Sequence, residues 1–284
     1  MNILLLGGGG SNGDWQAGKL LALVEHGHQW DHVVGCSVGA LNGIMYATGQ
    51  TEKLKPIWTT LTNDQVKSKR RNIALKINYL LHRAGIARPK MAVYSIHPLY
   101  EMMLKHLMNK KVLVDYECGV VIVGDESPDR YMKYQIQKGT ILKEVHIKHI
   151  LASCAIPVYF DPVEVNGMLM VDGGVHQSIP IRQTVHNMNP DKVTVIVCQP
   201  IEAGARKQPT DIVEMASWTV GAILKNQFLS ELERIEGLDV EKELYYPERS
   251  LGNSMNFDHS KTKPNFYTGY TLARNGNSHQ NLVT

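Results

Sequence analysis

The chain has 284 residues, of which 43% are hydrophobic and 20% charged, and its formal net charge is +3. This composition is ordinary for a soluble enzyme, and the length allows one α/β domain with a large core. No window approaches about eighteen uninterrupted apolar residues, so we expect no transmembrane helix.

The first predicted element is a buried strand at the start of the chain. Residues 1–6 are apolar, but the run is too short for a signal peptide and Met1-Asn2 supplies no basic n-region. We therefore expect the fold to begin at Met1. Gly7–Gly13 follows at once, and the spacing of apolar residues after it predicts a helix over Trp15–His26.

The glycine-rich loop between these elements can bind an anion in two ways. Its backbone N–H groups can hold a phosphate or the developing oxyanion of an acyl transfer. Gly8, Gly10 and Gly13 match the G-x-G-x-x-G pattern of dinucleotide sites. Such a site also requires an acidic residue at the end of the second strand, and this chain has Gly35-Cys36-Ser37 there. The oxyanion interpretation is therefore favoured.

The second strand leads into a G-x-S-x-G motif, Gly35-Cys36-Ser37-Val38-Gly39. The motif follows a predicted strand at His32–Gly35 and precedes a predicted helix at Ala40–Thr48. A strand, a sharp turn and a helix form the nucleophile elbow of serine hydrolases. The flanking glycines suit a turn too tight for neighbouring Cβ atoms. The pattern predicts a nucleophilic Ser37, although the same five residues also occur in ordinary turns.

Residues 65–90 carry eight basic residues and no acidic one. Apolar residues at helical spacing within this segment predict a basic amphipathic helix. Two interpretations stay open: the helix lies on an anionic membrane, or it packs on the core with a solvated basic face. A lid that covers the site in water and lifts at an interface would combine them. Nucleic acid is not expected as a partner. The candidate membrane-contact residues are Lys69, Arg70, Arg71, Lys76 and Arg83.

The remaining elements continue the alternation of strands and helices, which predicts an α/β fold with helices on both faces of a sheet. We expect a single domain over residues 1–284, with a basic helical insertion or lid at about 51–110 and a loop-rich tail at about 251–284. The further strands are predicted at Val112–Val114, Gly119–Val123, Tyr131–Gln137, Leu169–Val171 and Val193–Cys198, and the further helices at Pro98–Met108, Leu142–Ser153 and Asp211–Ile235.

An aspartate with two glycines, Asp172-Gly173-Gly174, follows the apolar run that ends at Val171. Alone, this pattern is typical of a tight turn. In this chain, which also has a predicted nucleophile elbow, the same pattern places the Asp172 carboxylate at the end of a strand, where the two glycines leave it with little side-chain cover.

The sequence predicts neither a metal site nor a disulfide framework. The four cysteines form no C-x-x-C pair, and the twelve histidines show no metal-binding spacing. We expect reduced thiols in a cytoplasmic protein that is in peripheral contact with membranes at most, with no metal and no cofactor.

The three motifs, in this order, resemble the patatin-like phospholipase family. The resemblance covers residues 1 to about 50 and 143 to about 200. One departure is Asn12, since the family usually carries a basic residue at this position. The three motifs that carry the resemblance are Gly8-Gly9-Gly10-Ser11-Asn12-Gly13, Gly35-Cys36-Ser37-Val38-Gly39-Ala40 and Asp172-Gly173-Gly174. The resemblance extends to two segments before the aspartate, Ala152-Ser153-Cys154-Ala155-Ile156-Pro157 and Phe160-Asp161-Pro162-Val163.

The resemblance implies a three-layer α/β/α sandwich with a mostly parallel central sheet. It also implies a lipid acyl hydrolase that cleaves phospholipid acyl esters through a Ser37–Asp172 dyad and an acyl-enzyme, without calcium. The oxyanion hole would come from the backbone of Gly8, Gly9, Gly10 and Ser11. The supporting glycines of the motifs are Gly13, Gly35, Gly39, Gly173 and Gly174.

Alternatives remain for both the base and the reaction. His176 and His186 follow Asp172 and would satisfy the order of a Ser-Asp-His triad, but Ser37 lies after only the second strand, which favours the dyad. The same acyl-enzyme would serve an acyltransferase or a thioesterase. A binding module without turnover is the third alternative, and intact Ser37 and Asp172 argue against it.

Overall fold

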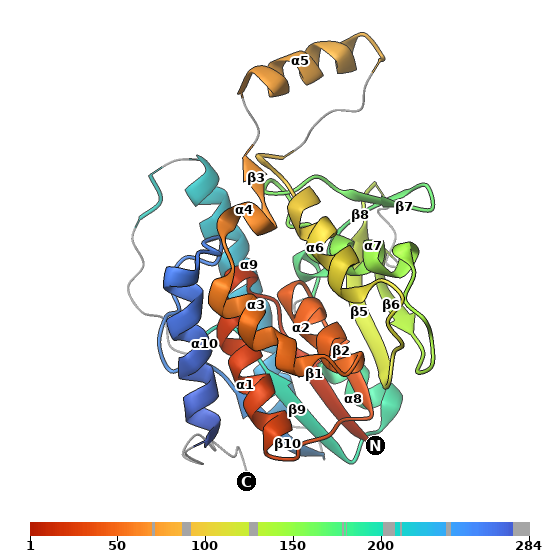
Figure 1. Cartoon of the computed structure of the whole chain (residues 1–284), viewed down its shortest axis with the longest axis vertical. Coiled ribbons are helices and arrows are strands. Elements are labelled where there is room, and N and C mark those ends of the chain that lie inside the picture. Colours follow the sequence, from red (N-terminus) through yellow and green to blue (C-terminus); the bar gives the residue numbers. More distant parts are fainter. Residues whose placement is uncertain are drawn as a thin grey trace.

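A computed structural model of the chain describes residues 1–69, 72–86, 92–124, 130–177, 179, 181–200, 208–210, 212–236 and 240–274. Its centre is an eight-stranded sheet between two layers of helices (Figure 1). The strand order is β10-β9-β1-β2-β5-β8-β7, and β6 pairs with β5 in addition. The strands are β1 (Asn2–Leu6), β2 (His32–Gly35), β5 (Asp115–Ile122), β6 (Tyr131–Ile136), β7 (Val163–Val165), β8 (Met168–Asp172), β9 (Lys192–Ile196) and β10 (Glu241–Tyr245).

The sheet is mostly parallel, as expected. Strands β10, β9, β1, β2 and β5 run in one direction, whereas β6 and β8 are antiparallel to β5. The predicted strand at Val112–Val114 does not form, because the chain enters the sheet only at Asp115.

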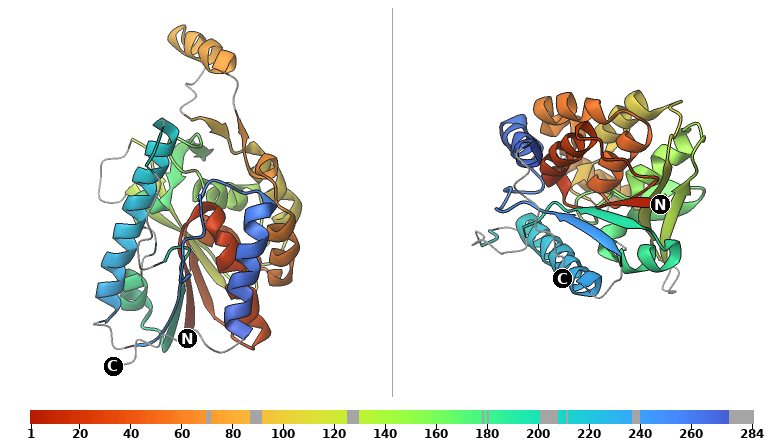
Figure 2. Two further views of the ribbon diagram at one scale, coloured as in Figure 1. Left: turned by 90° about the vertical axis from the view of Figure 1, so that its left-hand side faces the viewer. Right: turned by 90° about the horizontal axis from the view of Figure 1, so that it is seen from below.

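Helices cover both faces of the sheet (Figure 2), so the predicted α/β/α sandwich is confirmed. One layer holds two helices, α8 (Ile181–Met188) and α9 (Ile212–Glu236). The other layer consists of α1 (Gly13–Glu25), α2 (Val38–Ala47), α3 (Leu54–Thr60), α4 (Asn63–Val66), α6 (His97–Leu107), α7 (Glu144–Ala152) and α10 (His259–Arg274).

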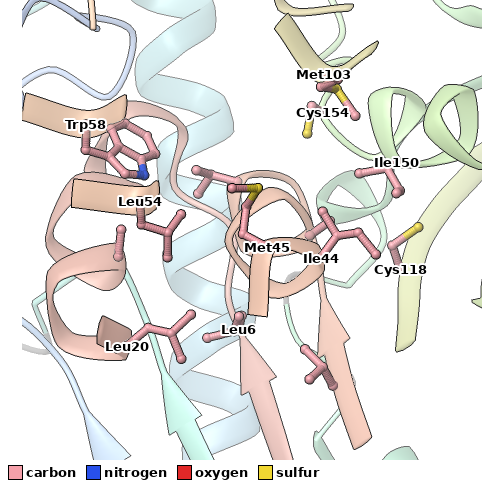
Figure 3. Close-up of a cluster of buried hydrophobic side chains, with 14 of the residues drawn as sticks. Leu6, Leu20, Ile44, Met45, Leu54, Trp58, Met103, Cys118, Ile150 and Cys154 are labelled. Atoms are coloured by element: carbon pink, nitrogen blue, oxygen red, sulfur yellow. The ribbon is translucent and has the colours of Figure 1, made fainter. Parts of the chain in front are cut away.

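The first strand shows why two layers are needed. Side chains alternate across a strand, and all four of Ile3, Leu4, Leu5 and Leu6 are buried. Leu4 and Leu6 belong to the larger core under α1 and α2, part of which is drawn in Figure 3. Ile3 and Leu5 belong to a second core that includes Phe228 of α9.

The register of the sheet brings two strand ends together. Gly35, the last residue of β2, pairs with Cys118 of β5, and Asp172, the last residue of β8, pairs with Val120. Strand β6 occupies one edge of β5 over residues 116–121, so β2 and β8 share the other edge. Their carboxyl ends therefore point toward each other. The residues just after Gly35 reach the level of Asp172.

The region between α2 and β5 is largely helical and includes one helix beyond a pair of short strands. Two short strands, β3 (Ser68–Lys69) and β4 (Tyr94–Ser95), form an antiparallel pair, and α5 (Asn72–Arg83) lies beyond them. Figures 1 and 2 show α5 standing away from the body of the molecule. Tyr79, Leu80 and Ile86 are 59%, 65% and 73% exposed. The described residues thus do not place α5 on the core or over the sheet as a lid.

The C-terminal region differs from the predicted loop-rich tail, because α10 occupies residues 259–274 and packs along α1. Two glycines explain the close fit of the helices. A Cβ on Gly18 would lie 2.1 Å from the carbonyl oxygen of Phe266, and one on Gly269 would lie 2.2 Å from that of Trp15. The polar composition of this segment did not predict a helix, because the helix is stabilised by tertiary packing and not by its own sequence pattern.

Across the described ranges, no helix combines the length and the apolar character needed to cross a bilayer.

Candidate active site

Ser37 occupies a strained turn between β2 and α2. Its φ of 55° and ψ of −127° are unusual for a residue with a side chain. The backbone on both sides leaves no room for other residues: a Cβ on Gly35 would lie 2.6 Å from the Ala40 Cα, and one on Gly39 would lie 2.2 Å from the Leu6 carbonyl oxygen. These contacts are the physical reason for the two glycines of the motif. The local geometry is that of a nucleophile elbow.

Two residues that the sequence reasoning did not single out hold this turn in place. The Ser37 amide donates a hydrogen bond to Ser153 Oγ at 3.0 Å, and the Cys154 thiol donates to the Ser37 carbonyl oxygen at 3.2 Å. Both residues follow α7, more than a hundred positions along the chain. Their segment carried the family resemblance, but nothing in its sequence indicated contacts with Ser37.

Asp172 meets Ser37 at the ends of their strands. The Ser37 hydroxyl is close enough to the Asp172 carboxyl to lower its pKa, and both residues are almost fully buried, Asp172 at 4% and Ser37 at 5% exposure. The Asp172 carboxylate also accepts hydrogen bonds from the Gly174 amide at 2.8 Å and from the Cys36 thiol at 3.6 Å. A Cβ on Gly173 would lie 2.4 Å from the Gly119 carbonyl oxygen, so this glycine permits the close turn after the aspartate.

The environment of Asp172 changes its ionisation. Burial raises the pKa of this carboxyl from 3.8 to about 6, while hydrogen bonds from Ser37, Gly174 and Cys36 act in the opposite direction. A carboxylate with a raised pKa is a stronger base than an ordinary aspartate. The pair therefore has the composition of a nucleophile with its base.

The glycine-rich loop lies directly against Ser37. A Cβ on Gly8 would be 3.2 Å from the Ser37 Cβ, and Gly10 lines the same pocket as Ser37. Within the described residues, the amides of Gly8, Gly9 and Gly10 have no hydrogen-bond acceptor. They are available to an oxyanion.

Ser11 departs from the predicted oxyanion hole. Its amide donates to the Ser254 carbonyl oxygen at 2.7 Å and is therefore engaged within the protein. The loop turns into a 3₁₀ helix, η1 (Gly10–Asn12), and this turn directs the Ser11 amide toward the C-terminal segment. The prediction that Ser11 serves as an oxyanion donor is corrected on this basis.

Within the described residues, no hydrogen bond joins the ring of His176 or His186 to Ser37 or Asp172. His176 is exposed and stacks on Tyr131, with ring centroids 5.0 Å apart. His186 is exposed on α8, which Figure 1 places toward the opposite end of the sheet.

An apolar pocket opens beside Ser37. Its walls come from α2, α3 and α6 and from the segment after α7, and several of these side chains are visible in Figure 3. Apart from Ser37, Asn42 and His106, the side chains that line it are apolar. The lining includes Val38, Leu41, Met45, Leu54, Trp58, Leu99, Met102, Met103, Cys154, Ile156, Phe160 and Phe257.

The candidate membrane-contact residues lie on β3, on α5 and between these two elements. Lys69 is exposed on β3 and Arg83 is exposed at the end of α5, while Lys76 occupies a position within α5. Arg70 and Arg71 lie outside the described residues.

All four cysteines are buried and free. Over the described parts of the chain, no cluster of three or more His, Cys, Asp or Glu residues is arranged to hold a metal ion.

Comparison with known proteins identifies the family. The model of the family described as patatin-like phospholipase matches residues 4–185, which include the glycine-rich loop, the elbow and Asp172. The chain belongs to the patatin-like phospholipase family. Membership supports lipid acyl hydrolysis as the general class of chemistry.

Curated relatives include proteins named as uncharacterized NTE family proteins from Mycobacterium bovis and Mycobacterium tuberculosis. Each is 24% identical to this patatin-like chain over 201 residues, which are 71% of this chain and 50% of the relative. The chain thus spans about half the length of the curated relatives it matches. Among solved structures, VipD from Legionella pneumophila aligns over 97% of this chain and 66% of its own, with a TM-score of 0.44 and 13% identity.

Proposed function

We propose that this protein is a serine lipid acyl hydrolase that cleaves fatty-acyl esters of phospholipids through Ser37 and Asp172. The observation that carries the proposal is the strained Ser37, which lies at the wall of an apolar pocket beside a buried carboxylate whose pKa it lowers. Strain at Ser37 and loss of solvation at Asp172 both cost stability, and such costs are typical of functional sites.

The reaction begins when Ser37 Oγ attacks the ester carbonyl carbon while Asp172 accepts the hydroxyl proton. The carbonyl oxygen becomes an oxyanion that the amides of Gly8, Gly9 and Gly10 can stabilise. The tetrahedral intermediate collapses, the C–O bond to the lyso product breaks, and Asp172 returns its proton to the leaving oxygen. A water molecule, deprotonated by Asp172, then attacks the acyl-enzyme. Free fatty acid leaves, and Ser37 regains its proton.

The pocket suits the acyl part of the substrate. Its lining is apolar apart from Ser37, Asn42 and His106 and holds no Lys or Arg for an anionic head group, whereas each methylene of an acyl chain gains about 0.8 kcal/mol on leaving water. The acyl chain is therefore expected in the pocket and the head group toward solvent.

Helix α5 supports contact with an anionic membrane surface. It exposes Tyr79 and Leu80, and its surroundings carry Lys69 and Arg83 without an acidic residue over residues 65–90. Exposed apolar side chains beside basic ones are typical of helices that bind the head-group region of anionic membranes. The alternative of a core-packed helix receives no support from the exposed side chains of α5.

The proposal is tested with a soluble short-chain nitrophenyl ester and with phosphatidylcholine, each assayed with wild type and Ser37→Ala. Hydrolysis of both substrates, lost in the variant, is the expected result. Hydrolysis that persists in Ser37→Ala contradicts the assignment of the nucleophile. Addition of an acceptor alcohol separates the alternatives: acyl transfer at the expense of free fatty acid would favour an acyltransferase. A thioester substrate that reacts much faster than the oxygen ester would favour a thioesterase.

A further inference from the structure

Lys261, on α10, has a buried ammonium group at the glycine-rich loop. Its side chain is only 13% exposed. The ammonium donates hydrogen bonds to Ser11 Oγ at 2.6 Å and to Asn12 Oδ1 at 2.9 Å, and it lies 3.7 Å from Asp14 Oδ2. A lysine from the last helix thus contacts three residues within the first fifteen of the chain.

A buried ammonium is costly unless it is well paired. Burial lowers the pKa of Lys261, and the Asp14 carboxylate partly offsets this effect. An ion pair with Asp14 alone would not require contacts with Ser11 and Asn12. The two shorter distances go to the loop, and the longer one goes to the carboxylate. The position of the ammonium is therefore set by the loop.

The same C-terminal segment holds the loop through its backbone. The Ser254 carbonyl oxygen accepts the Ser11 amide, and the Asn253 carbonyl oxygen accepts the Ser11 hydroxyl at 3.1 Å. Gly10 has a φ of +57°, and a Cβ there would lie 2.3 Å from the Ser254 carbonyl oxygen. Residues 253–261, which lie beyond the part matched by the family model, thus shape the turn that follows the free amides.

The loop has no positive charge of its own, because residues 7–13 are glycines, a serine and an asparagine. An ammonium that holds Ser11 and Asn12 contributes positive potential at the residues that directly follow Gly8, Gly9 and Gly10 in the loop. In a water-excluded site such a charge acts strongly on a developing oxyanion, because little solvent screens it.

We propose that Lys261 is a positioning residue for the oxyanion hole: its ammonium fixes the Gly10–Asn12 turn and supplies the positive charge that the loop lacks. This inference rests on the proposed function of Ser37. It assigns to the C-terminal helix a part in the reaction besides its packing on α1.

The test compares kcat and KM for a soluble nitrophenyl ester in wild type, Asp14→Asn/Lys261→Met and Asn12→Asp. The double variant removes both members of the buried ion pair, so no unpaired charge is left inside. Asn12→Asp keeps the shape of the side chain and an acceptor for Lys261 but cancels its charge at the loop. Lys263→Met, at an exposed position on the same helix, is the matched control.

We expect kcat to fall at least about tenfold in both test variants, with KM and the thermal midpoint near wild type and no change in Lys263→Met. If Lys261 only neutralises Asp14, the double variant keeps the wild-type kcat. Wild-type kcat in either folded test variant overturns the inference. Ser37→Ala, assayed in parallel, separates this failure from that of the proposed function. Wild-type activity in Ser37→Ala would contradict the assignment of Ser37 as the nucleophile, not the role of Lys261.

Discussion

Replacement of Asp172 by asparagine should raise the stability of the protein while it removes the activity. The carboxylate is buried, and its ionisation is opposed by the loss of solvation, which raises its pKa from 3.8 to about 6. Asparagine keeps an oxygen acceptor for the Gly174 amide but carries no charge. The variant therefore removes the cost of ionisation with little change in shape.

The magnitude follows from the two pKa values. The difference between 3.8 and about 6, at about 1.4 kcal/mol for each pKa unit, corresponds to about 3 kcal/mol at neutral pH. Because the folded pKa lies above the unfolded one, the folded state binds more protons within this window. The contribution of Asp172 to stability is thus fully present below pH 3.8 and is lost as the pH rises through about 6.

The assay is urea unfolding of wild type and Asp172→Asn at pH 4, 6 and 8, followed by circular dichroism. We expect the free energies of unfolding to be nearly equal at pH 4 and the variant to gain up to about 3 kcal/mol at pH 8. A variant that is less stable than wild type at pH 8, or a difference that does not change with pH, would refute the reasoning. In that case the carboxylate would be stabilised by its hydrogen bonds more than burial destabilises it.

Three further predictions concern the activity. The ionisation of Asp172 should give kcat/KM an acidic limb with an apparent pKa of about 6, measured from pH 4.5 to 8 with a soluble ester. Met103→Trp, which fills the apolar pocket from α6, should lower kcat/KM for long-chain esters by about tenfold or more, in a series of nitrophenyl esters of increasing length. Lys69→Glu/Arg83→Glu should weaken sedimentation with vesicles rich in phosphatidylserine and leave hydrolysis of a soluble ester unchanged, because both charges lie on the insertion.

Each of these predictions has an outcome that contradicts it. A flat pH profile above pH 4.5 would remove Asp172 as the base. Equal losses on short and long esters in Met103→Trp would mean a general effect on folding rather than a shorter acyl site. For the insertion, the control is Lys110→Glu/Lys111→Glu, exposed just before β5. Equal loss of vesicle binding in the two charge-reversal variants would count against specific docking through α5.

The sequence was most informative where the structure is local. The elbow around Ser37 and the turn after Asp172 depend on glycines within two residues, so their motifs could be recognised directly. The alternation of strands and helices also predicted the layers of the fold. The meeting of Ser37 and Asp172 itself depends on the shared edge of β5, and only the order of the family motifs pointed to it.

Contacts between distant segments could not be predicted. The Ser11 amide was expected to face the substrate, but it pairs with Ser254, more than two hundred residues away. Lys261 lies in a polar stretch with Pro264 and Gly269, which offered little sign of a helix. That helix forms because it packs closely along α1, and a lysine reaches the loop only as a result of this packing.

The most direct test of the central claim is fatty-acid release from mixed phospholipid vesicles by wild type, Ser37→Ala and Asp172→Ala, in the presence of a chelator. We expect release by wild type and a loss of at least about three orders of magnitude in both variants, as for other serine hydrolases. Full release by Asp172→Ala would contradict the dyad and redirect the search for the base to His176. Full release by Ser37→Ala would contradict the account as a whole.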